Sequence, residues 1–210
     1  MNQSCSNRLT RWMVMALMGA MFILAACAGQ SPATPTTAQP VPTASQVAVL
    51  PPDCSNGITP SQTEGPYYKA NTPERASLIE PGMAGARIIV AGYILTRDCK
   101  PIAGAWLDFW QANDTGEYDN SGYTLRGHQF TDASGRYTLE TILPGLYPGR
   151  TRHIHVKVQA PNQPVLTTQL YFPEEQHNNA DNIYDPKLLV TWQDTPGGKI
   201  ALYNFVLNVK

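Results

Sequence analysis

The stretch "TDASGRYTLETILPGLYPGRTRHIHVKVQAPNQPVLTTQLYF", residues 131–172, contains three short runs that are rich in β-branched and aromatic residues. The runs cover residues 136–142, 152–160 and 165–172, and the turn-forming sequences "LPG" and "PNQP" lie between them. Short runs that end at glycine and proline are typical of β-strands joined by tight connections. This stretch therefore predicts three consecutive strands.

The central run, "RHIHVKVQA", alternates in character along its length. Successive side chains on a strand point to opposite faces, so His153 and His155 are expected on one face. Ile154, Val156 and Val158 then face the core. The strand is therefore expected to contribute to a packed core and to present two imidazoles together.

Comparable runs occur along the rest of the chain, whereas no long segment shows the 3.6-residue apolar period of a helix. Asp-Gly and Pro-Gly turns separate these runs, which cover residues 87–96, 102–111, 128–131, 188–193 and 199–210. Seven or eight strands at this spacing predict an all-β fold. We expect an antiparallel β-sandwich of about eight strands, with long loops forming a metal site.

The N-terminal region has the pattern of an export signal. A basic start is followed by the uncharged run "MVMALMGAMFILAAC", too short to span a bilayer comfortably. Its end, "LAAC", resembles a bacterial lipobox, which implies cleavage before Cys27 and lipidation of that residue. The alternative is ordinary cleavage near "AACA", which would release a free secreted protein. We expect residues 1–26 to be a lipoprotein signal peptide.

Residues 27–52 follow as an uncharged tether rich in proline and threonine, and residues 53–210 form a single domain. We therefore expect an exported, membrane-anchored lipoprotein on the periplasmic or extracellular face. Without the two signal arginines, the 15 basic residues fall to 13 against 16 acidic ones. No basic patch is visible, so nucleic acid is not expected as a partner.

Export also bears on the four cysteines. Cys5 lies in the signal and Cys27 in the lipobox, which leaves Cys54 and Cys99 in an oxidising compartment. We expect these two to form a disulfide that pins the start of the domain to a turn. Two separate thiols are the alternative.

The pair His153 and His155 raises the question of a metal. An H-x-H pair on a strand is a common ligand arrangement, but two solvent-facing histidines would give the same pattern. A zinc site needs further ligands, and neither His128 nor His177 lies in a recognisable ligand motif. A cupin-type iron or manganese site needs a glutamate soon after the pair, and none follows.

Tyrosines are close to the histidine pair in sequence or in expected position. Tyr147 precedes His153 by six residues, across a Pro-Gly turn, and Tyr118 ends the element "WQANDTGEY" after an apolar strand. Phenolate oxygen is a hard anionic ligand and imidazole an intermediate one. Two of each suit a hard trivalent ion better than zinc.

Four elements together resemble the intradiol ring-cleavage dioxygenases, nearest to protocatechuate 3,4-dioxygenase and its exported relatives. They are "TEGPYY" (63–68), "WQANDTGEY" (110–118), "TDASGRYTLETILPGLYPGRTRHIH" (131–155) and "TQLYF" (168–172). They occur in the order of that family, from about Pro60 to the C-terminus. Alone, the H-x-H pair would be a weak signal, whereas four elements in register are specific.

The resemblance implies one non-haem Fe(III) per site and a role for each matching residue. The implied iron ligands are Tyr118, Tyr147, His153 and His155, with Tyr147 as the ligand that leaves when substrate binds. Arg150 is implied as the active-site arginine and Gln169 as a residue that lines the site. Tyr67, the first tyrosine of "GPYY", is implied to lie near the substrate.

The implied reaction is cleavage of a catechol-type ring between its two hydroxyl-bearing carbons, with O₂, to a cis,cis-muconate. One departure concerns the substrate: Gly149 follows Pro148 where protocatechuate enzymes have a tryptophan and a longer insert. The identity of the catechol and the oligomeric state therefore stay open. The non-catalytic alternative is a carboxypeptidase-regulatory or transthyretin-like β-sandwich module, which part of the sequence also resembles.

Overall fold

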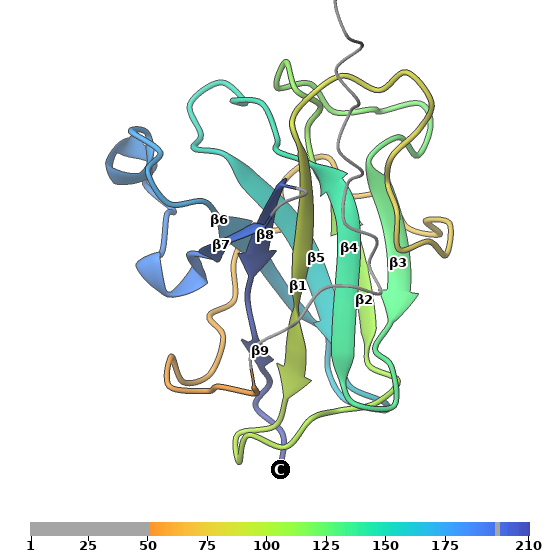
Figure 1. Ribbon diagram of the computed structural model, residues 1–210, viewed down its shortest axis with the longest axis vertical. Helices are drawn as coiled ribbons and strands as arrows, with labels where there is room; N and C mark the ends of the chain where they lie inside the picture. Colours follow the sequence, from red (N-terminus) through yellow and green to blue (C-terminus); the bar gives the residue numbers. More distant parts are fainter. Residues whose placement is uncertain (1–50, 196–197) are drawn as a thin grey trace, which may run out of the picture. The chain divides into compact units, whose positions relative to one another are not determined.

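The computed structural model describes residues 51–195 and 198–210 (Figure 1). The expected signal peptide, Cys27 and all but the last two residues of the expected tether lie outside the described residues. The elements in chain order are β1 (Arg87–Leu95), β2 (Trp106–Trp110), β3 (Arg126–Phe130), β4 (Arg136–Ile142), β5 (His153–Gln159), β6 (Leu166–Tyr171), η2 (Asn178–Ala180), η3 (Pro186–Leu188), β7 (Thr191–Thr195), β8 (Gly198–Leu202) and β9 (Phe205–Val206).

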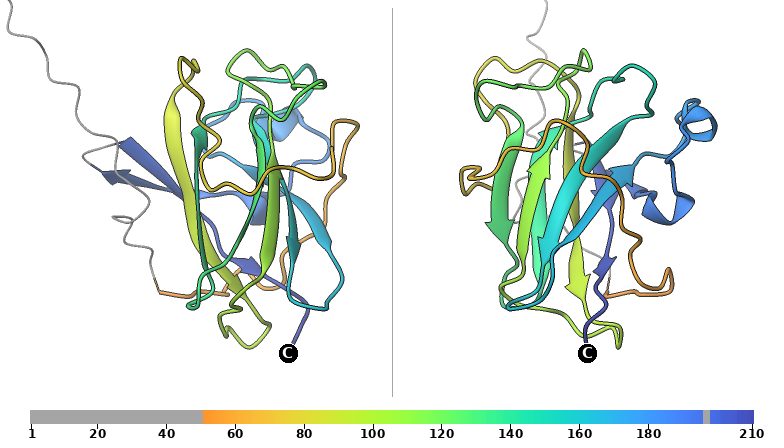
Figure 2. Two further views of the ribbon diagram at one scale, coloured as in Figure 1. Left: turned by 90° about the vertical axis from the view of Figure 1, so that its right-hand side faces the viewer. Right: turned by 180° about the vertical axis from the view of Figure 1, so that it is seen from behind.

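The strands form two packed sheets, so the expected all-β sandwich is confirmed (Figure 2). One sheet has the order β4-β1-β8-β7, with β9 also pairing with β1, and the other has the order β3-β2-β5-β6. The second sheet is antiparallel throughout. In the first sheet, β8 and β9 pair with β1 in parallel, which a purely antiparallel sandwich does not include.

The described chain has nine strands rather than about eight because the last run, 199–210, is divided. Between β8 and β9 the side chain of Asn204 accepts a hydrogen bond from the Tyr93 backbone N–H at 3.0 Å. A side chain thus takes the place of a backbone acceptor at this point. The backbone also passes so close to β1 that a Cβ at Gly92 would lie 1.8 Å from the Tyr203 carbonyl oxygen.

The core lies between the two sheets, as the alternation of side chains predicts. Ile154, Val156 and Val158 of β5 are completely buried. Leu107 and Phe109 of β2 are buried in the same cluster, together with Leu139 of β4. The opposite faces of β2 and β5 therefore point away from this core.

A segment at the start of the domain covers that outer face of the four-stranded sheet. This crossing segment, residues 60–75, passes over the sheet from one edge to the other (Figure 2, right). At the β6 edge the Gln62 N–H donates to the Thr167 carbonyl at 2.8 Å, and at the β3 edge the Arg75 N–H donates to the His128 carbonyl at 2.8 Å. Several side chains on the outer face, including Asp108, His155 and Gln169, are consequently buried as well.

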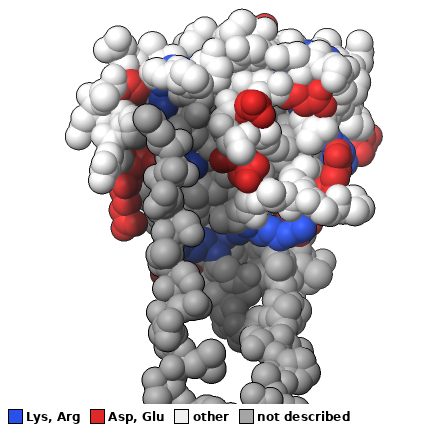
Figure 3. Space-filling view, turned by 90° about the horizontal axis from the view of Figure 1, so that it is seen from above, with Lys and Arg blue, Asp and Glu red and all other residues white. Residues whose placement is uncertain are grey.

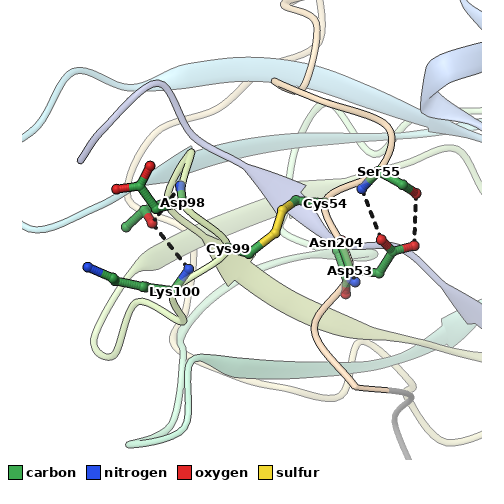
Figure 4. Close-up of a disulfide and its surroundings, with 8 residues drawn as sticks. Asp53, Cys54, Ser55, Asp98, Cys99, Lys100 and Asn204 are labelled. Atoms are coloured by element: carbon green, nitrogen blue, oxygen red, sulfur yellow. Dashed lines mark hydrogen bonds between the residues drawn. A yellow bond between two sulfur atoms is a disulfide. The ribbon is translucent and has the colours of Figure 1, made fainter.

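The start of the described chain is joined to the connection after β1. Cys54 and Cys99 form a disulfide, the pairing expected from the sequence, and their Cα atoms are 5.8 Å apart (Figure 4). The pair spans 45 residues of sequence. Within the described ranges, no helix has the length and apolar character needed to cross a membrane.

Candidate metal centre

One row of residues crosses the four-stranded sheet near the ends of its strands. In the strand register, Trp110 of β2 lies opposite Arg126 of β3 on one side and opposite His155 of β5 on the other. Gln169 of β6 completes the row opposite His155. Residues directly opposite on neighbouring strands share a face, so this row lies under the crossing segment.

Three of the four expected ligands have donor atoms in direct contact. Nε2 of His153 lies 3.1 Å from Nε2 of His155 and 3.2 Å from the hydroxyl oxygen of Tyr118. Nδ1 of His153 is 2.7 Å from the Thr151 carbonyl oxygen and donates to it. The proton on Nδ1 leaves Nε2 with a lone pair directed at the other two donors, the tautomer that a metal-binding histidine needs.

Both imidazoles are buried and neutral. His153 is 4% and His155 is 3% exposed. Burial, assisted by the charge of Arg150, lowers the pKa of His153 to about 4. Burial also lowers the pKa of His155 well below its ordinary value, with His153 and Arg150 acting in the same direction. At neutral pH the histidines therefore offer lone pairs rather than positive charge.

An aromatic neighbour packs face to face against the ring of His155. The Trp110 ring stacks on it with centroids 4.8 Å apart and planes 5° apart. His155 Nδ1 and Trp110 Nε1 are buried and have no hydrogen-bond partner among the described residues. Packing, rather than a hydrogen bond on Nδ1, sets the orientation of this ring.

The two tyrosines come from loops whose backbones touch. Tyr118 lies in the β2–β3 loop, residues 111–125, and Tyr147 in the β4–β5 loop, residues 143–152. The Gly145 N–H donates to the Asn113 carbonyl at 2.7 Å. Gly116 has φ +89°, and a Cβ there would lie 2.1 Å from the Leu146 carbonyl oxygen. Only glycine allows this approach.

Tyr147 is near the other ligands, but its hydroxyl is engaged elsewhere. It lies 2.9 Å from the hydroxyl of Tyr67, and its ring contacts the Tyr118 ring edge-on at 5.8 Å. Tyr67 stacks on Tyr118 with centroids 4.5 Å apart. Burial raises the pKa of Tyr118, while the charges of Arg150 and Arg126 act against that rise. The three tyrosines thus form one packed group above the histidines.

Arg150 is fixed at the edge of this group, chiefly by Asp181 and Gln169, and its Nη2 also lies 3.5 Å from the Tyr171 hydroxyl. Its Nε donates to Asp181 at 2.8 Å, and its Nη2 donates to the Gln169 side-chain oxygen at 2.7 Å. Its Nη1 forms no hydrogen bond to any described residue, so this nitrogen is the one available to a bound ligand. Gln169 also donates to the Thr63 carbonyl at 2.9 Å and accepts from the Tyr171 hydroxyl at 3.0 Å.

These contacts refine the expectations from sequence. Gln169 reaches the site by holding Arg150, and its amide is already used by protein groups. Asp181 was not foreseen, because it lies in the polar stretch 173–187 that carries no motif. Its carboxylate holds both Arg150 and, at 3.0 Å, the backbone N–H of Thr151. Burial acts to raise its pKa, but the hydrogen bonds from Thr151, Ile183 and Arg150 outweigh burial and lower it.

The donor set fits a hard trivalent metal ion and not a typical zinc site. Across the described residues, no group of three or more histidine, cysteine, aspartate or glutamate side chains could hold a metal. A centre here therefore depends on the phenol oxygen of Tyr118 beside the two imidazoles. Phenolate with neutral imidazole is chemistry suited to ferric iron.

The loops of the centre lie at the upper end of the molecule as drawn in Figure 1. Seen from that end, acidic side chains form several small separate patches among uncharged surface (Figure 3). Lys and Arg side chains are seen mainly in a row at the lower edge of the same view.

The fold and the site together define a β-sandwich with a buried histidine–tyrosine centre, and comparisons with known proteins identify the family. Residues 63–207 match the family model described as dioxygenase. Hydroxyquinol 1,2-dioxygenase of Rhizobium sp. (strain MTP-10005) is 30% identical over 159 residues, which cover 63% of this chain and 54% of the relative. The chain belongs to the intradiol dioxygenase family, as its sequence motifs predict.

Solved structures agree with this assignment. The dioxygenase domain of a dioxygenase carbohydrate-binding protein fusion from Streptomyces sp. SirexAA-E is 54% identical, with a TM-score of 0.71. The match covers 73% of this chain and 99% of that one. For 3-chlorocatechol 1,2-dioxygenase from Rhodococcus opacus 1CP the identity is 28%, the coverage 74% and 75%, and the TM-score 0.67.

The chain spans about half the length of the curated relatives it matches, 54% and 52% for the first two. The second of these is catechol 1,2-dioxygenase of Candida albicans. The non-catalytic binding module is not favoured, because the family model and these relatives are all dioxygenases.

Proposed function

We propose that the protein is a non-haem Fe(III) intradiol dioxygenase. It cleaves a catechol-type ring between the two hydroxyl-bearing carbons and inserts both atoms of O₂, giving a cis,cis-muconate. One observation carries the proposal: inside a chain of this family, Nε2 of His153 lies 3.1 Å from Nε2 of His155 and 3.2 Å from the Tyr118 hydroxyl oxygen.

His153, His155 and Tyr118 would hold the iron, with Tyr147 as the fourth protein ligand. When bound, Fe(III) supplies the Lewis acid and electron acceptor that make a deprotonated catechol reactive toward O₂. The residues prepare for this ion in two ways. Thr151 fixes the tautomer of His153, and burial keeps both imidazoles uncharged.

Tyr147 and Tyr67 provide a place for a proton. A catechol must lose its hydroxyl protons to become reactive, and a side chain within hydrogen-bond reach can accept one. The Tyr147 oxygen, as phenolate, would take up such a proton and remain held by the Tyr67 hydroxyl 2.9 Å away. The pair therefore keeps a released Tyr147 in place while substrate occupies the site.

Arg150 provides a fixed positive charge beside the reacting ring. Asp181 and Gln169 hold two of its nitrogens, so the third nitrogen can donate to an oxygen on which negative charge develops. A donor fixed before the reaction needs no reorganisation during it. Gln169 acts here as the residue that orients Arg150.

The crossing segment shields the centre from water and places Tyr67 over it. Gly65 lies close to the His155 ring, where a Cβ would meet Cε1 at 3.4 Å. The segment carries Tyr67 and its neighbour Tyr68, whose ring contacts Trp110 at 4.9 Å. It thereby covers both the His155 ring and the Trp110 ring.

The relatives indicate a substrate with a catechol ring, but they do not indicate which substituent the ring carries. Matched relatives are named for hydroxyquinol, catechol, 3-chlorocatechol and, in one beta chain, protocatechuate. The absence of a tryptophan after Pro148 separates this chain from the protocatechuate pattern. We propose that all four compounds be tested as substrates.

We further propose that the enzyme is exported and attached to a membrane by a lipid on Cys27, with residues 28–52 as a tether. The "LAAC" sequence and the apolar run before it support this location. The disulfide between Cys54 and Cys99 is consistent with an oxidising compartment.

The test is ring cleavage under ¹⁸O₂. The iron-loaded protein is incubated with each catechol, and the product is identified by NMR and mass spectrometry. The proposal predicts a cis,cis-muconate with two labelled oxygens, and loss of product in Tyr118→Phe. Tyr123→Phe is the control, because its hydroxyl only donates to the Ala70 carbonyl. Two results would contradict the proposal. One is a product of ring opening next to the two hydroxyl-bearing carbons instead of between them, and the other is no product from any of the four catechols.

A further inference from the structure

Arg126 is a buried cation for which the proposed chemistry has no use. It begins β3, lies opposite Trp110 in the row that includes His155, and is 0% exposed. Among the described residues it forms no salt bridge. Burying a charge without an opposite charge is costly, so such a residue persists where its hydrogen bonds are structurally important.

The hydrogen bonds of its guanidinium run to two backbone carbonyls from different parts of the chain. Nη1 donates to the Tyr67 carbonyl at 2.6 Å. Nε and Nη2 both donate to the Asp119 carbonyl, at 3.1 Å and 3.0 Å. One planar group thus joins the crossing segment to the β2–β3 loop.

The carboxylate of Asp119, whose main-chain carbonyl Arg126 binds, is occupied within its own loop. The carboxylate of Asp119 accepts hydrogen bonds from the backbone N–H groups of Ser121, Gly122 and Thr124, at 2.7 to 2.9 Å. Only the main-chain oxygen of Asp119 faces Arg126. Asp119 therefore shapes the loop, while Arg126 connects that loop to the rest of the site.

The two joined peptides position the stacked tyrosines. One carbonyl belongs to Tyr67, and the other belongs to the residue directly after Tyr118. The rings of Tyr67 and Tyr118 stack with centroids 4.5 Å apart and planes 14° apart. The backbone just before Arg126 is also unusual, because Leu125 is a non-glycine residue with φ +55°. Such a conformation persists only where the surroundings hold it.

We propose that Arg126 is a positioning residue that sets the spacing between Tyr67 and Tyr118. It acts through the geometry of its fork, since a lysine ammonium is a point charge that cannot reproduce three hydrogen bonds to two separated carbonyls. Lys69 and Ala70 of the crossing segment also bond the later part of the β2–β3 loop. Loss of the fork therefore lets the two segments move apart locally, at Tyr67 and Tyr118, and Tyr118 then turns away from His153. The consequence for iron rests on the proposed function, whereas the consequence for the backbone does not.

The test compares four variants of the full chain. Arg126→Lys keeps the charge and loses the fork, and Arg126→Met loses both. Arg75→Met is the control for a general loss of contact between the two segments. Arg75 is the last residue of the crossing segment and donates to the Tyr123 carbonyl of the β2–β3 loop and to the Arg126 carbonyl, but it has no hydrogen bond to Tyr67. Leu139→Ala is the control for lost stability, since Leu139 is a core residue of the other sheet.

The first readout is amide hydrogen exchange of the iron-free protein. The proposal predicts faster exchange in residues 63–70 and 113–124 together in Arg126→Lys and in Arg126→Met. Neither control is expected to speed exchange in residues 63–70. If Arg126→Met does not fold, Arg126→Lys decides the outcome. Exchange in Arg126→Lys equal to that of the parent in both segments would overturn the proposal.

The second readout concerns the iron-loaded protein. Arg126→Lys is expected to lose Fe(III) to a chelator about 10-fold more readily than the parent and to shift the visible tyrosine-to-iron absorption band. Leu139→Ala should leave the band in place. Unchanged retention and an unchanged band in Arg126→Lys would contradict the effect on Tyr118. A parent protein that binds no iron would refute the proposed function instead, and the exchange readout would still decide the role of Arg126.

Discussion

His153 and Arg150 each have one end hydrogen-bonded to the protein and the other directed at the site. The Nδ1–H of His153 donates a hydrogen bond to the Thr151 carbonyl, which leaves Nε2 free to bind a ligand. Nε and Nη2 of Arg150 donate to Asp181 and Gln169, and Nη1 is left available for a bound ligand. Fixing one end of a side chain before a ligand binds lowers the entropic cost of binding. The polar neighbours of the site therefore matter as much as the ligands.

Asp181→Asn tests this at the arginine. The variant replaces the charged acceptor of Arg150 Nε and weakens the hydrogen bond from the Thr151 N–H. We expect a loss of about 2 kcal/mol in the free energy of unfolding, the range for hydrogen bonds to charged groups, and a lower kcat at neutral pH. Urea unfolding and steady-state kinetics measure the two effects.

The pH dependence of the same variant gives an independent check. The pKa of Asp181 is lowered in the folded protein, so its stabilising contribution is fully present above the ordinary value of 3.8. The contribution is lost as the pH falls from that value through the lower folded-state pKa. The stability difference between parent and Asp181→Asn should therefore shrink in acid. A difference that stays constant on acidification would exclude a role for the ionised carboxylate.

At the scale of elements, the site depends on close contact between two loops. Gly116→Ala places a Cβ against the Leu146 carbonyl and puts a non-glycine residue at φ +89°. We expect it to separate the β2–β3 loop from the β4–β5 loop and to lower both stability and iron binding. Calorimetry and iron titration measure the two quantities.

Gly104→Ala is the matched control for that loop contact. Gly104 also has a positive φ, +65°, but nothing lies within 4 Å of a Cβ built there. The loss of stability in Gly104→Ala should be limited to the conformational cost of a positive φ, about 1–2 kcal/mol, and iron binding should be unchanged. Equal losses in both variants would mean that the contact between the loops is unimportant.

The strands could be predicted from sequence because their signal is local. The run 136–142 matches β4 residue for residue, and β5 begins within one residue of the expected start. Family motifs also predicted that His153, His155, Tyr118 and Tyr147 gather at one place, and the structure brings these side chains together. The parallel pairing of β8 with β1 was not, because no local pattern encodes which strand a distant run joins.

The residues that hold the site were harder to predict than the ligands. Asp181 and Arg126 make their contacts across 31 and 59 residues of sequence, and neither contact leaves a local pattern. Tyr67 was expected near the substrate, but the path of its segment over the sheet depends on hydrogen bonds at both edges and was not predicted. Burial of the two histidines follows from that path, so it was not visible in the sequence.

At the scale of the whole molecule, the disulfide fixes the beginning of the domain. It closes a loop between two cysteines 45 residues apart in sequence, and this loop contains the crossing segment and β1. The double variant Cys54→Ser, Cys99→Ser should lose about 2–4 kcal/mol in the free energy of unfolding. Urea unfolding measures the loss, with the reduced parent protein as a control. An unchanged unfolding midpoint would show that the disulfide is not needed for the domain.

The lipid anchor is the other prediction at this scale. Cys27→Ser in the full chain should remove the lipid-modified N-terminus and move the protein from the membrane fraction to the soluble fraction. Mass spectrometry of the N-terminal peptide and fractionation of cells test this. A parent protein that is soluble and unmodified would contradict the anchor and favour ordinary cleavage, without affecting the ring-cleavage proposal.

The central claim is that Tyr118, His153 and His155 form a ferric centre that binds catechols. The most direct measurement is the visible absorption spectrum of the ferric-loaded protein, recorded before and after anaerobic addition of each catechol. We predict a broad tyrosine-to-iron absorption band that shifts to longer wavelength with a substrate and is weakened or lost in Tyr118→Phe. A protein that stays colourless after loading with ferric iron would contradict the claim.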